Sequence, residues 1–493
     1  MITRPIAHTT AGDLGGCLED GLYVFRGVPY AEPPVGDLRW RAARPHAGWT
    51  GVRDASAYGP SAPQPVEPGG SPILGTHGDP PFDEDCLTLN LWTPNLDGGS
   101  RPVLVWIHGG GLLTGSGNLP NYATDTFARD GDLVGISINY RLGPLGFLAG
   151  MGDENVWLTD QVEALRWIAD NVAAFGGDPN RITLVGQSGG AYSIAALAQH
   201  PVARQLFHRA ILQSPPFGMQ PHTVEESTAR TKALARHLGH DDIEALRHEP
   251  WERLIQGTIG VLMEHTKFGE WPLAFYPVFD EATIPRHPIE SIIDSDIEII
   301  IGWTRDEGTF PFAFDPQVSQ ADRDQVESWL QKRFGDHAAS AYEAHAGDGT
   351  SPWTVIANVV GDELFHSAGY RVADERATRR PVRAYQFDVV SPLSDGALGA
   401  VHCIEMPFTF ANLDRWTGKP FVDGLDPDVV ARVTNVLHQA WIAFVRTGDP
   451  THDQLPVWPT FRADDPAVLV VGDEGAEVAR DLARPDHVSV RTL

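Results

Sequence analysis

A serine enclosed by glycines follows directly on a short apolar stretch, and this feature limits the possible folds of the chain more than any other. Residues 182–193 read ITLVGQSGGAYS, with Ser188 at the centre of the pattern G-x-S-x-G. A plain strand followed by a glycine turn would produce the same letters. However, residues 182–185 are typical of a buried strand and residues 191–197 are compatible with a helix. This order predicts a nucleophile elbow, in which the serine oxygen is exposed at the end of a sheet.

Strand-like and helix-like patterns alternate along most of the chain. Apolar runs predict strands at residues 87–94, 102–111, 133–140, 182–186, 209–214, 297–303, 382–389 and 467–471. Apolar residues at helical spacing predict helices at 160–172 and 427–446. The alternation indicates an α/β fold with a mostly parallel sheet that is covered by helices on both faces. We expect one domain over residues 1–493, with the Pro- and Gly-rich loop 59–81 as a candidate lid.

The charge of the chain narrows the range of partners. The formal net charge is -28, which argues against nucleic acid and anionic membranes, because both attract clustered Lys and Arg. We find no signal-peptide pattern at the start and no apolar run near the length of a membrane span. The three cysteines, Cys17, Cys86 and Cys403, are too few for a disulfide framework. We expect a cytoplasmic monomer or weak homo-oligomer without metal or cofactor.

A second glycine run can supply the backbone N–H donors that a reaction at a serine nucleophile needs for its oxyanion. The run His108-Gly109-Gly110-Gly111 ends an earlier predicted strand, as the oxyanion loop of many serine hydrolases does. We expect the backbone N–H groups of Gly110, Gly111 and Gly189 to form an oxyanion hole. A glycine turn without function is the alternative for this run alone, and it becomes less plausible once the serine motif follows.

The acid and the base of a triad should follow the serine along the chain, in that order. Asp306 and Glu307 both come directly after a predicted strand, and position alone does not separate them. Among the later histidines, His402 lies in a glycine-containing loop after another strand, and position favours it over His366 and His438.

A series of blocks resembles one known family almost end to end. The chain resembles the type-B carboxylesterases of the α/β-hydrolase fold, a family that includes bacterial p-nitrobenzyl esterases, animal carboxylesterases and cholinesterases. The blocks are FRGVPYAEPPVGDLRWRAARP, EDCLTLNLWTP, VLVWIHGGG, INYRLGPLGFL, DQVEALRWIADNVAAFGGDPNRITLVGQSGGA, RAILQS, TRDEGTF, HCIEMPFTF and WIAFVRTGDP. The resemblance implies Ser188 as nucleophile, Glu307 as acid and His402 as base. It also implies structural ion pairs between Arg39 and Glu84 and between Arg141 and Asp160.

The chain departs from the family pattern in ways that bear on substrates. Gln187 stands where many members have Glu, and Leu112 stands where an aromatic residue is common. The family sequence Ser-Ala-Gly at the nucleophile is replaced here by Ser188-Gly189-Gly190. The cysteine that often pairs with the EDCL cysteine is replaced by Ala62. Residues 62–86 contain no tryptophan that could stack on a quaternary ammonium group. These departures favour a general esterase over a cholinesterase.

We therefore expect a serine carboxylesterase that hydrolyses short, neutral esters through an acyl-enzyme intermediate. The predicted substrate pocket comprises Leu112, Leu113, Gln187 and Phe275, the last within an apolar stretch at 271–276. The same residues could serve carbamate or amide hydrolysis, and a non-catalytic adhesion or scaffold protein is a further alternative.

Overall fold

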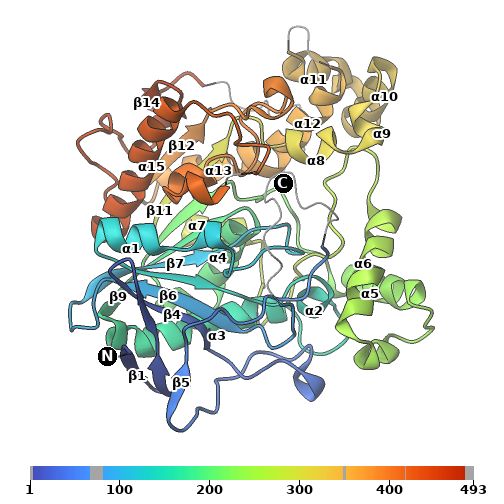
Figure 1. Ribbon diagram of the computed structural model, residues 1–493. Coiled ribbons are helices and arrows are strands. Elements are labelled where there is room, and N and C mark those ends of the chain that lie inside the picture. The colour runs from blue at the N-terminus through green and yellow to red at the C-terminus, as the bar shows by residue number, and fades with distance from the viewer. Residues whose placement is uncertain (1–3, 67–80, 348–350, 417, 483–493) are drawn as a thin grey trace.

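An eleven-stranded sheet runs through the molecule (Figure 1). The computed structural model describes residues 4–66, 81–347, 351–416 and 418–482. In spatial order the strands of the sheet are β14 (Gly475–Ala479), β13 (Val468–Gly472), β12 (Val382–Phe387), β11 (Glu298–Thr304), β10 (Arg209–Gln213), β9 (Gly177–Gln187), β7 (Arg101–Ile107), β8 (Val134–Ile138), β6 (Thr88–Thr93), β4 (Leu22–Pro29) and β3 (Cys17–Glu19). Neighbours from β13 to β8 pair in parallel, and both edges of the sheet are antiparallel. The α/β class is confirmed.

Each predicted strand is present, although several of them end earlier than expected, and the largest difference is in β7. The run predicted over 102–111 leaves the sheet at Ile107, because Gly110 and Gly111 adopt φ values of 111° and 61° that no strand accommodates. A small separate sheet, which no sequence pattern predicted, is formed by β1 (Ile6–Thr9), β2 (Gly12–Gly15) and β5 (Val52–Asp54).

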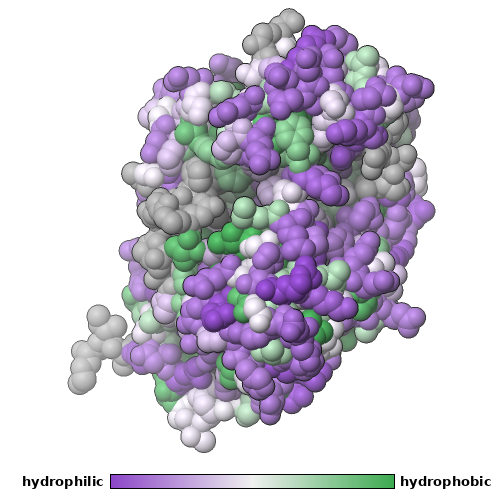
Figure 2. Space-filling model, turned by 90° about the vertical axis from the view of Figure 1, so that its right-hand side faces the viewer, coloured by the Kyte–Doolittle hydropathy of each residue, from purple (hydrophilic) through white to green (hydrophobic). Residues whose placement is uncertain are grey.

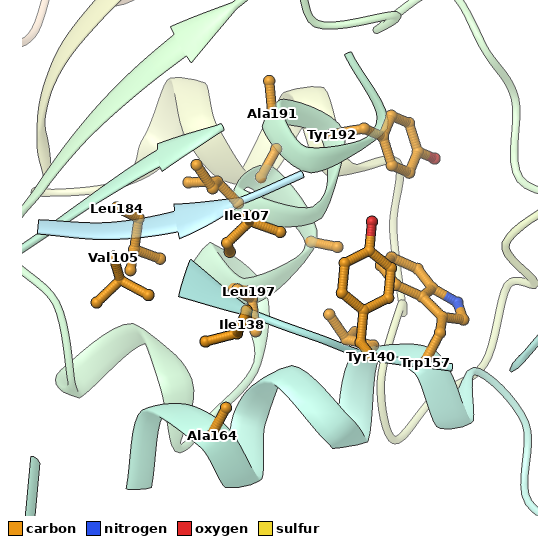
Figure 3. Packing of buried hydrophobic residues seen from close by; sticks show 14 of the residues in the cluster. Val105, Ile107, Ile138, Tyr140, Trp157, Ala164, Leu184, Ala191, Tyr192 and Leu197 are labelled. Atoms are coloured by element: carbon orange, nitrogen blue, oxygen red, sulfur yellow. The ribbon is translucent and has the colours of Figure 1, made fainter. Parts of the chain in front are cut away.

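Side chains alternate between the two faces of the sheet and meet a different set of helices on each face. Val105 and Ile107 of β7 pack with residues of α3 (Val156–Asn171) and α4 (Gly189–Gln199), and Figure 3 shows this layer from close by. Leu104 and Trp106 point to the opposite face and pack with α1 (Asp125–Gly131), α14 (Met406–Thr409) and α15 (Pro427–Thr447). The sheet is thus covered on both sides, as a parallel sheet requires.

The remaining helices lie at the ends and beside the sheet. They are α2 (Gly143–Phe147), α5 (Val224–His237), α6 (Trp251–His265), α7 (Pro288–Asp294), α8 (Thr309–Ala313), α9 (Pro316–Ser319), α10 (Arg323–Phe334), α11 (Ala338–His345), α12 (Trp353–Gly361) and α13 (Ser367–Ala377). Helices α8 to α12 lie together at the upper right of Figure 1 and share a hydrophobic cluster of their own. Within the described ranges, no helix combines the length and the apolar character needed to cross a bilayer.

Both predicted ion pairs are present. Arg39 Nε donates to Glu84 Oε2 at 2.7 Å. Arg141 Nη2 lies 2.6 Å from Asp160 Oδ1, and these two side chains are 3% and 0% exposed. Because the second pair is buried, removing one partner would leave an uncompensated charge in the core. The pair ties the segment after β8 to α3. Most of the candidate lid 59–81, residues 67–80, lies outside the described residues.

Candidate active site

Ser188 occupies a strained turn between β9 and α4. Its φ of 55° and ψ of -124° lie in a region that non-glycine residues rarely adopt, and such strain costs about 1–3 kcal/mol. The glycines around it are required by close packing: a Cβ on Gly190 would clash with the carbonyl oxygen of Ile107, and one on Gly186 would meet Gly190 at 2.6 Å. The strand, turn and helix therefore have the geometry of a nucleophile elbow.

The glycine run after β7 folds against this turn. A Cβ on Gly109 would lie 3.0 Å from the Cβ of Ser188. Within the part of the chain that the structure describes, the N–H groups of Gly110 and Gly111 donate to no other residue. Gly189 is the first residue of α4, whose first N–H groups have no acceptor within the helix. Three donors near one serine are suited to binding an oxyanion.

Glu307 and His402 meet in the interior, although 95 residues separate them. The Glu307 side chain is fully buried; its Oε1 accepts from the Thr304 N–H at 2.8 Å, and its Oε2 accepts from His402 Nδ1. Burial by itself raises the pKa of Glu307, but the charge and hydrogen bond of His402 outweigh burial and lower the pKa. Glu307 is thus ionised and fixes the orientation of the imidazole.

The Nε2 atom of His402 contacts Gln187, the residue before the serine. The amide Nε2 of Gln187 lies 3.1 Å from it and donates to it when the imidazole is neutral. Burial lowers the pKa of His402, whereas the Cys403 sulfur and the Glu307 carboxylate raise it, and the net pKa lies well above its usual value. Two aromatic rings enclose the imidazole: Phe365 at 4.9 Å and Trp271 at 6.0 Å between ring centroids.

An apolar cavity opens beside Ser188. The cavity itself is narrow, with a volume of about 30 Å³, and the wider space free of protein atoms around it, which includes open solvent, amounts to about 350 Å³. Its lining residues are Gly111, Leu112, Ser188, Gly189, Pro216, Met219, Trp271, Leu273, Leu364 and Phe365. Because Trp271 and Phe365 contact both the cavity and the His402 ring, the cavity joins the serine to the histidine.

The structure places one of the four predicted pocket residues on this cavity. Leu112 lines it, with a φ of 61°. Leu113 lies against the start of α2, Gln187 turns its amide to the imidazole, and Phe275 is 4% exposed within the core. Leu113, Gln187 and Phe275 therefore do not line the cavity, because the side chain of each contacts other parts of the protein.

Several wall residues gave no signal in the sequence. Pro216 and Met219 come from the segment after β10, and Leu364 and Phe365 come from the π-helix η7 (Asp362–His366), which interrupts the helix between α12 and α13. A π-turn has no composition by which it could be recognised, although such turns are frequent at functional sites.

The alternative base candidates have other partners. His366 contacts the carboxylate of Asp362 at 2.6 Å and the Thr304 carbonyl at 2.8 Å. His438 on α15 contacts the Thr409 carbonyl at 2.9 Å and Asp130 at 3.2 Å. Neither ring contacts Glu307 or Gln187, the two residues that His402 meets on either side of its ring.

Asp306, the alternative acid, accepts from the Ala400 N–H at 2.7 Å and supports the loop that carries His402. No group of three or more His, Cys, Asp or Glu side chains suited to a metal ion occurs in residues 4–66, 81–347, 351–416 and 418–482.

Comparison with known sequences agrees with this geometry. A family model described as the carboxylesterase family matches residues 3–488. The para-nitrobenzyl esterase of Bacillus subtilis (strain 168) is 33% identical over 487 residues, which cover 96% of each protein. The fumonisin B1 esterase of Sphingopyxis macrogoltabida is 31% identical over 479 residues, which cover 92% of this chain and 84% of that protein.

Solved structures give the same result. A carboxylesterase of Geobacillus stearothermophilus, determined at pH 6.2, superposes with a TM-score of 0.85 at 34% identity, and the match covers 97% of this chain and 98% of that one. A para-nitrobenzyl esterase structure superposes with a TM-score of 0.86 at 31% identity over 99% of both chains. The chain therefore belongs to the carboxylesterase family and is a serine carboxylic ester hydrolase.

Proposed function

We propose that Ser188 is the nucleophile of this esterase, His402 its general base and Glu307 the acid that orients His402. One observation carries the proposal: a strained serine lies on an apolar cavity whose aromatic walls contact a histidine that is hydrogen-bonded to a buried carboxylate. A serine hydroxyl becomes a nucleophile only when a neighbouring base accepts its proton, and this arrangement supplies such a base.

In the first half of the proposed reaction, Ser188 Oγ attacks the ester carbonyl and His402 Nε2 takes the hydroxyl proton. The N–H groups of Gly110, Gly111 and Gly189 hold the oxyanion, and each such donor contributes roughly a hundred- to a thousandfold in rate. The intermediate then breaks its bond to the alcohol oxygen, and His402 returns the proton to the departing alcohol. The acyl group remains on Ser188 as an ester.

In the second half, His402 takes a proton from a water molecule, which attacks the acyl-serine carbonyl in the same oxyanion hole. Collapse of the intermediate breaks the bond to Ser188 Oγ, which regains its proton from His402, and the carboxylic acid is released. Glu307 stays ionised throughout and stabilises the imidazolium formed in each half.

A fluorophosphonate probe tests this proposal directly. The probe labels only a serine that a base activates, so mass spectrometry of the digested protein should find it on the peptide that contains Ser188. His402→Ala should prevent labelling while the protein stays folded. Labelling on another serine, or equal labelling of the His402 variant, would contradict the assignment.

Gln187→Glu should raise the acidic-limb midpoint of kcat/KM by about one pH unit or more, because a carboxylate beside Nε2 favours the imidazolium form of His402. The base must be neutral to act, so a higher pKa moves the rise in activity to higher pH. The present contact is a neutral amide at 3.1 Å. A pH series of kcat/KM on p-nitrophenyl acetate measures the shift.

Gln187→Met is the matched control, since it keeps the length of the side chain without adding a charge. Its midpoint should stay closer to that of the wild type than the midpoint of the glutamate variant. An unchanged or lowered midpoint in Gln187→Glu would mean that residue 187 does not interact with His402.

The proposed substrates are short, neutral esters. The cavity wall is apolar, and none of its residues carries a charge that could pair with a quaternary ammonium group. Each buried methylene adds roughly 0.8 kcal/mol of binding free energy until the cavity is full. The face of the molecule in Figure 2 is mostly hydrophilic, with hydrophobic residues gathered mainly near its middle. Together with a net charge of -28, such a surface does not favour adsorption to lipid.

Across a series of p-nitrophenyl esters, kcat/KM should peak between acetate and about hexanoate, because the narrow cavity beside Ser188 leaves little room for a longer acyl chain. Triolein emulsions and butyrylcholine should be poor substrates. A peak at palmitate, activation at a lipid interface, or faster turnover of choline esters than of neutral esters would defeat this proposal.

Met219→Ala sharpens the test, because Met219 lines the cavity and its truncation adds space there. The optimum should move to longer acyl chains. Met263→Ala makes the same chemical change on α6, where the side chain is 78% exposed, and should keep the wild-type optimum.

We further propose that the protein works as one domain over residues 1–493, as a monomer or weak oligomer in a reducing compartment such as the cytoplasm. The state of its thiols supports the compartment. Burial and the adjacent Glu19 raise the pKa of Cys17 to about 11, and burial raises the pKa of Cys86, which is fully buried. Both cysteines are therefore held as unreactive thiols.

A further inference from the structure

A compact cluster of two histidines and one aspartate lies behind Glu307. His345 is the last residue of α11, and Asp362 and His366 are the first and last residues of the π-helix η7. Asp362 binds both imidazoles: its Oδ2 lies 3.0 Å from His345 Nε2, and its Oδ1 lies 2.6 Å from His366 Nδ1. The three side chains are 5%, 18% and 13% exposed in chain order.

The contacts of each ring indicate that both histidines are charged. The second nitrogen of His345 faces the Ala341 carbonyl at 2.8 Å, and the second nitrogen of His366 faces the Thr304 carbonyl at 2.8 Å. Carboxylates and carbonyls only accept, and a neutral imidazole has a single N–H. Four acceptor contacts therefore require two imidazolium rings. Two positive rings and one carboxylate leave one net positive charge.

The pKa shifts of the three residues agree with two charged imidazoles and one charged carboxylate. Burial lowers the pKa of His366, but the hydrogen bond and charge of Asp362 outweigh it and raise the pKa to about 9. The pKa of Asp362, which burial raises, is lowered to about 2 by its two histidine partners. The pKa of His345 is likewise raised, since Asp362 outweighs burial. His366 and Asp362 therefore both stay charged at neutral pH.

Thr304 links this charge to the triad. Its carbonyl accepts from His366, and its N–H donates to Glu307 Oε1 at 2.8 Å. The charge of His366 is one of the influences that lower the pKa of Glu307. A carboxylate that is partly neutralised from one side holds a proton on the histidine at its other side less strongly.

The π-helix η7 also shapes the cavity beside Ser188. Leu364 and Phe365 line the cavity, and Phe365 packs on the His402 ring, while the next residue, His366, turns to β11. The contacts of His366 therefore fix the turn that presents Phe365 to the base.

We propose that the cluster of His345, Asp362 and His366 acts as a positively charged positioning device, which limits how strongly Glu307 retains a proton on His402 and so lowers the pH above which His402 can act as a base. The inference rests on the proposed function, because it requires His402 to be the base. His366 touches neither substrate nor Ser188, so it is a positioning residue.

The other charged groups near His366 do not supply the same charge. Asp388, which follows β12, interacts with His366, and its Oδ2 lies 3.8 Å from Arg305 Nη1. Glu363, the neighbour in η7, is bound by Arg333 at 2.9 Å. Both carboxylates are negative and lie beside an arginine, Arg305 being shared between Asp388 and Asp306, so the positive charge that faces Glu307 comes from the cluster.

His366→Gln tests the proposal, because the amide can still donate to the Thr304 carbonyl but carries no charge. The acidic-limb midpoint of kcat/KM should rise by roughly one pH unit, the effect of removing one charge at moderate distance. Activity below the midpoint should fall about tenfold and return to the wild-type value above it. An unchanged midpoint overturns the proposal, and so does an equal loss at every pH, which a merely structural role would give.

Two further variants complete the test. His366→Lys retains the charge and should keep the wild-type midpoint; a midpoint raised as in the glutamine variant would overturn the role of charge. If His366→Gln does not fold, His345→Gln should raise the midpoint in the same direction, and an unchanged midpoint there overturns the proposal.

His237→Gln is the matched control. It removes a histidine–carboxylate pair of 2.9 Å between α5 and α6, with Glu264 as the partner, and should not change the profile. Fluorophosphonate labelling of the wild type separates the two hypotheses: a failure to label Ser188 refutes the proposed function, whereas labelling with an unshifted midpoint in the variants refutes only this inference.

Discussion

Ser188→Ala should lower kcat for p-nitrophenyl acetate by roughly a millionfold, the loss measured when the nucleophile of a serine triad is removed. The fold should survive, because no described residue forms a hydrogen bond with the Ser188 hydroxyl and the side chain is 8% exposed. Alanine adopts the strained backbone at a cost similar to that for serine. Single-turnover assays with circular dichroism and thermal melting separate a loss of chemistry from a loss of structure.

Ser291→Ala provides the control for this change. It removes a hydroxyl of similar burial on α7, outside the proposed site, and should leave kcat within about twofold, as most substitutions away from a functional group do. A folded Ser188→Ala protein with wild-type turnover would refute the assignment of the nucleophile.

Glu307→Gln should lower kcat by about ten-thousandfold, as loss of the orienting carboxylate does in a well-studied triad. The amide cannot stabilise the imidazolium that forms on His402, and it can present an N–H where the ring also presents one. Since Glu307 is fully buried with its oxygens on Thr304 and His402, glutamine fits the same space. Steady-state kinetics on p-nitrophenyl acetate measure the effect.

Asp306→Asn is the natural comparison, because the two acids are adjacent in the chain. The Asp306 carboxylate accepts a hydrogen bond from the Ala400 N–H at 2.7 Å and does not contact the imidazole. The kcat of Asp306→Asn should therefore fall by less than about tenfold, and its melting temperature should fall somewhat. Equal losses in the two variants, or a larger loss for Asp306→Asn, would reverse the assignment.

Local patterns predicted those parts of the fold that local physics determines. The strand before Ser188, the turn and α4 could be predicted because a buried strand, close-packed glycines and a helix each have their own signature within a few residues. The end of β7 was placed too late, since Trp106-Ile107 and the following glycines look continuous until their backbone angles are known. The two antiparallel edges of the sheet had no such signature.

The same distinction between local patterns and tertiary packing applies to the residues of the site. Position in the chain did not separate Glu307 from Asp306, because both follow β11 and only the folded loop at 399–402 decides which carboxylate meets His402. The family resemblance named Glu307, and Glu307 is the carboxylate that contacts His402. The cavity wall was predicted in part: Leu112 and residues of the stretch 271–276 line it, whereas Met219 and Phe365 reach it from segments whose arrangement depends on tertiary packing.

The separation of the site residues along the chain has a consequence for how the protein matures. Gln187 and His402 are in contact although 215 residues separate them, and Glu307 meets His402 across 95 residues. Contacts this distant in sequence form late, since a long stretch of chain must be ordered before they are made. On the proposed assignment, a nascent chain that has emerged as far as α4 carries the nucleophile and the oxyanion loop without their base. We therefore expect esterase activity only when the C-terminal half has joined the sheet, so that its return marks the completion of folding rather than its beginning.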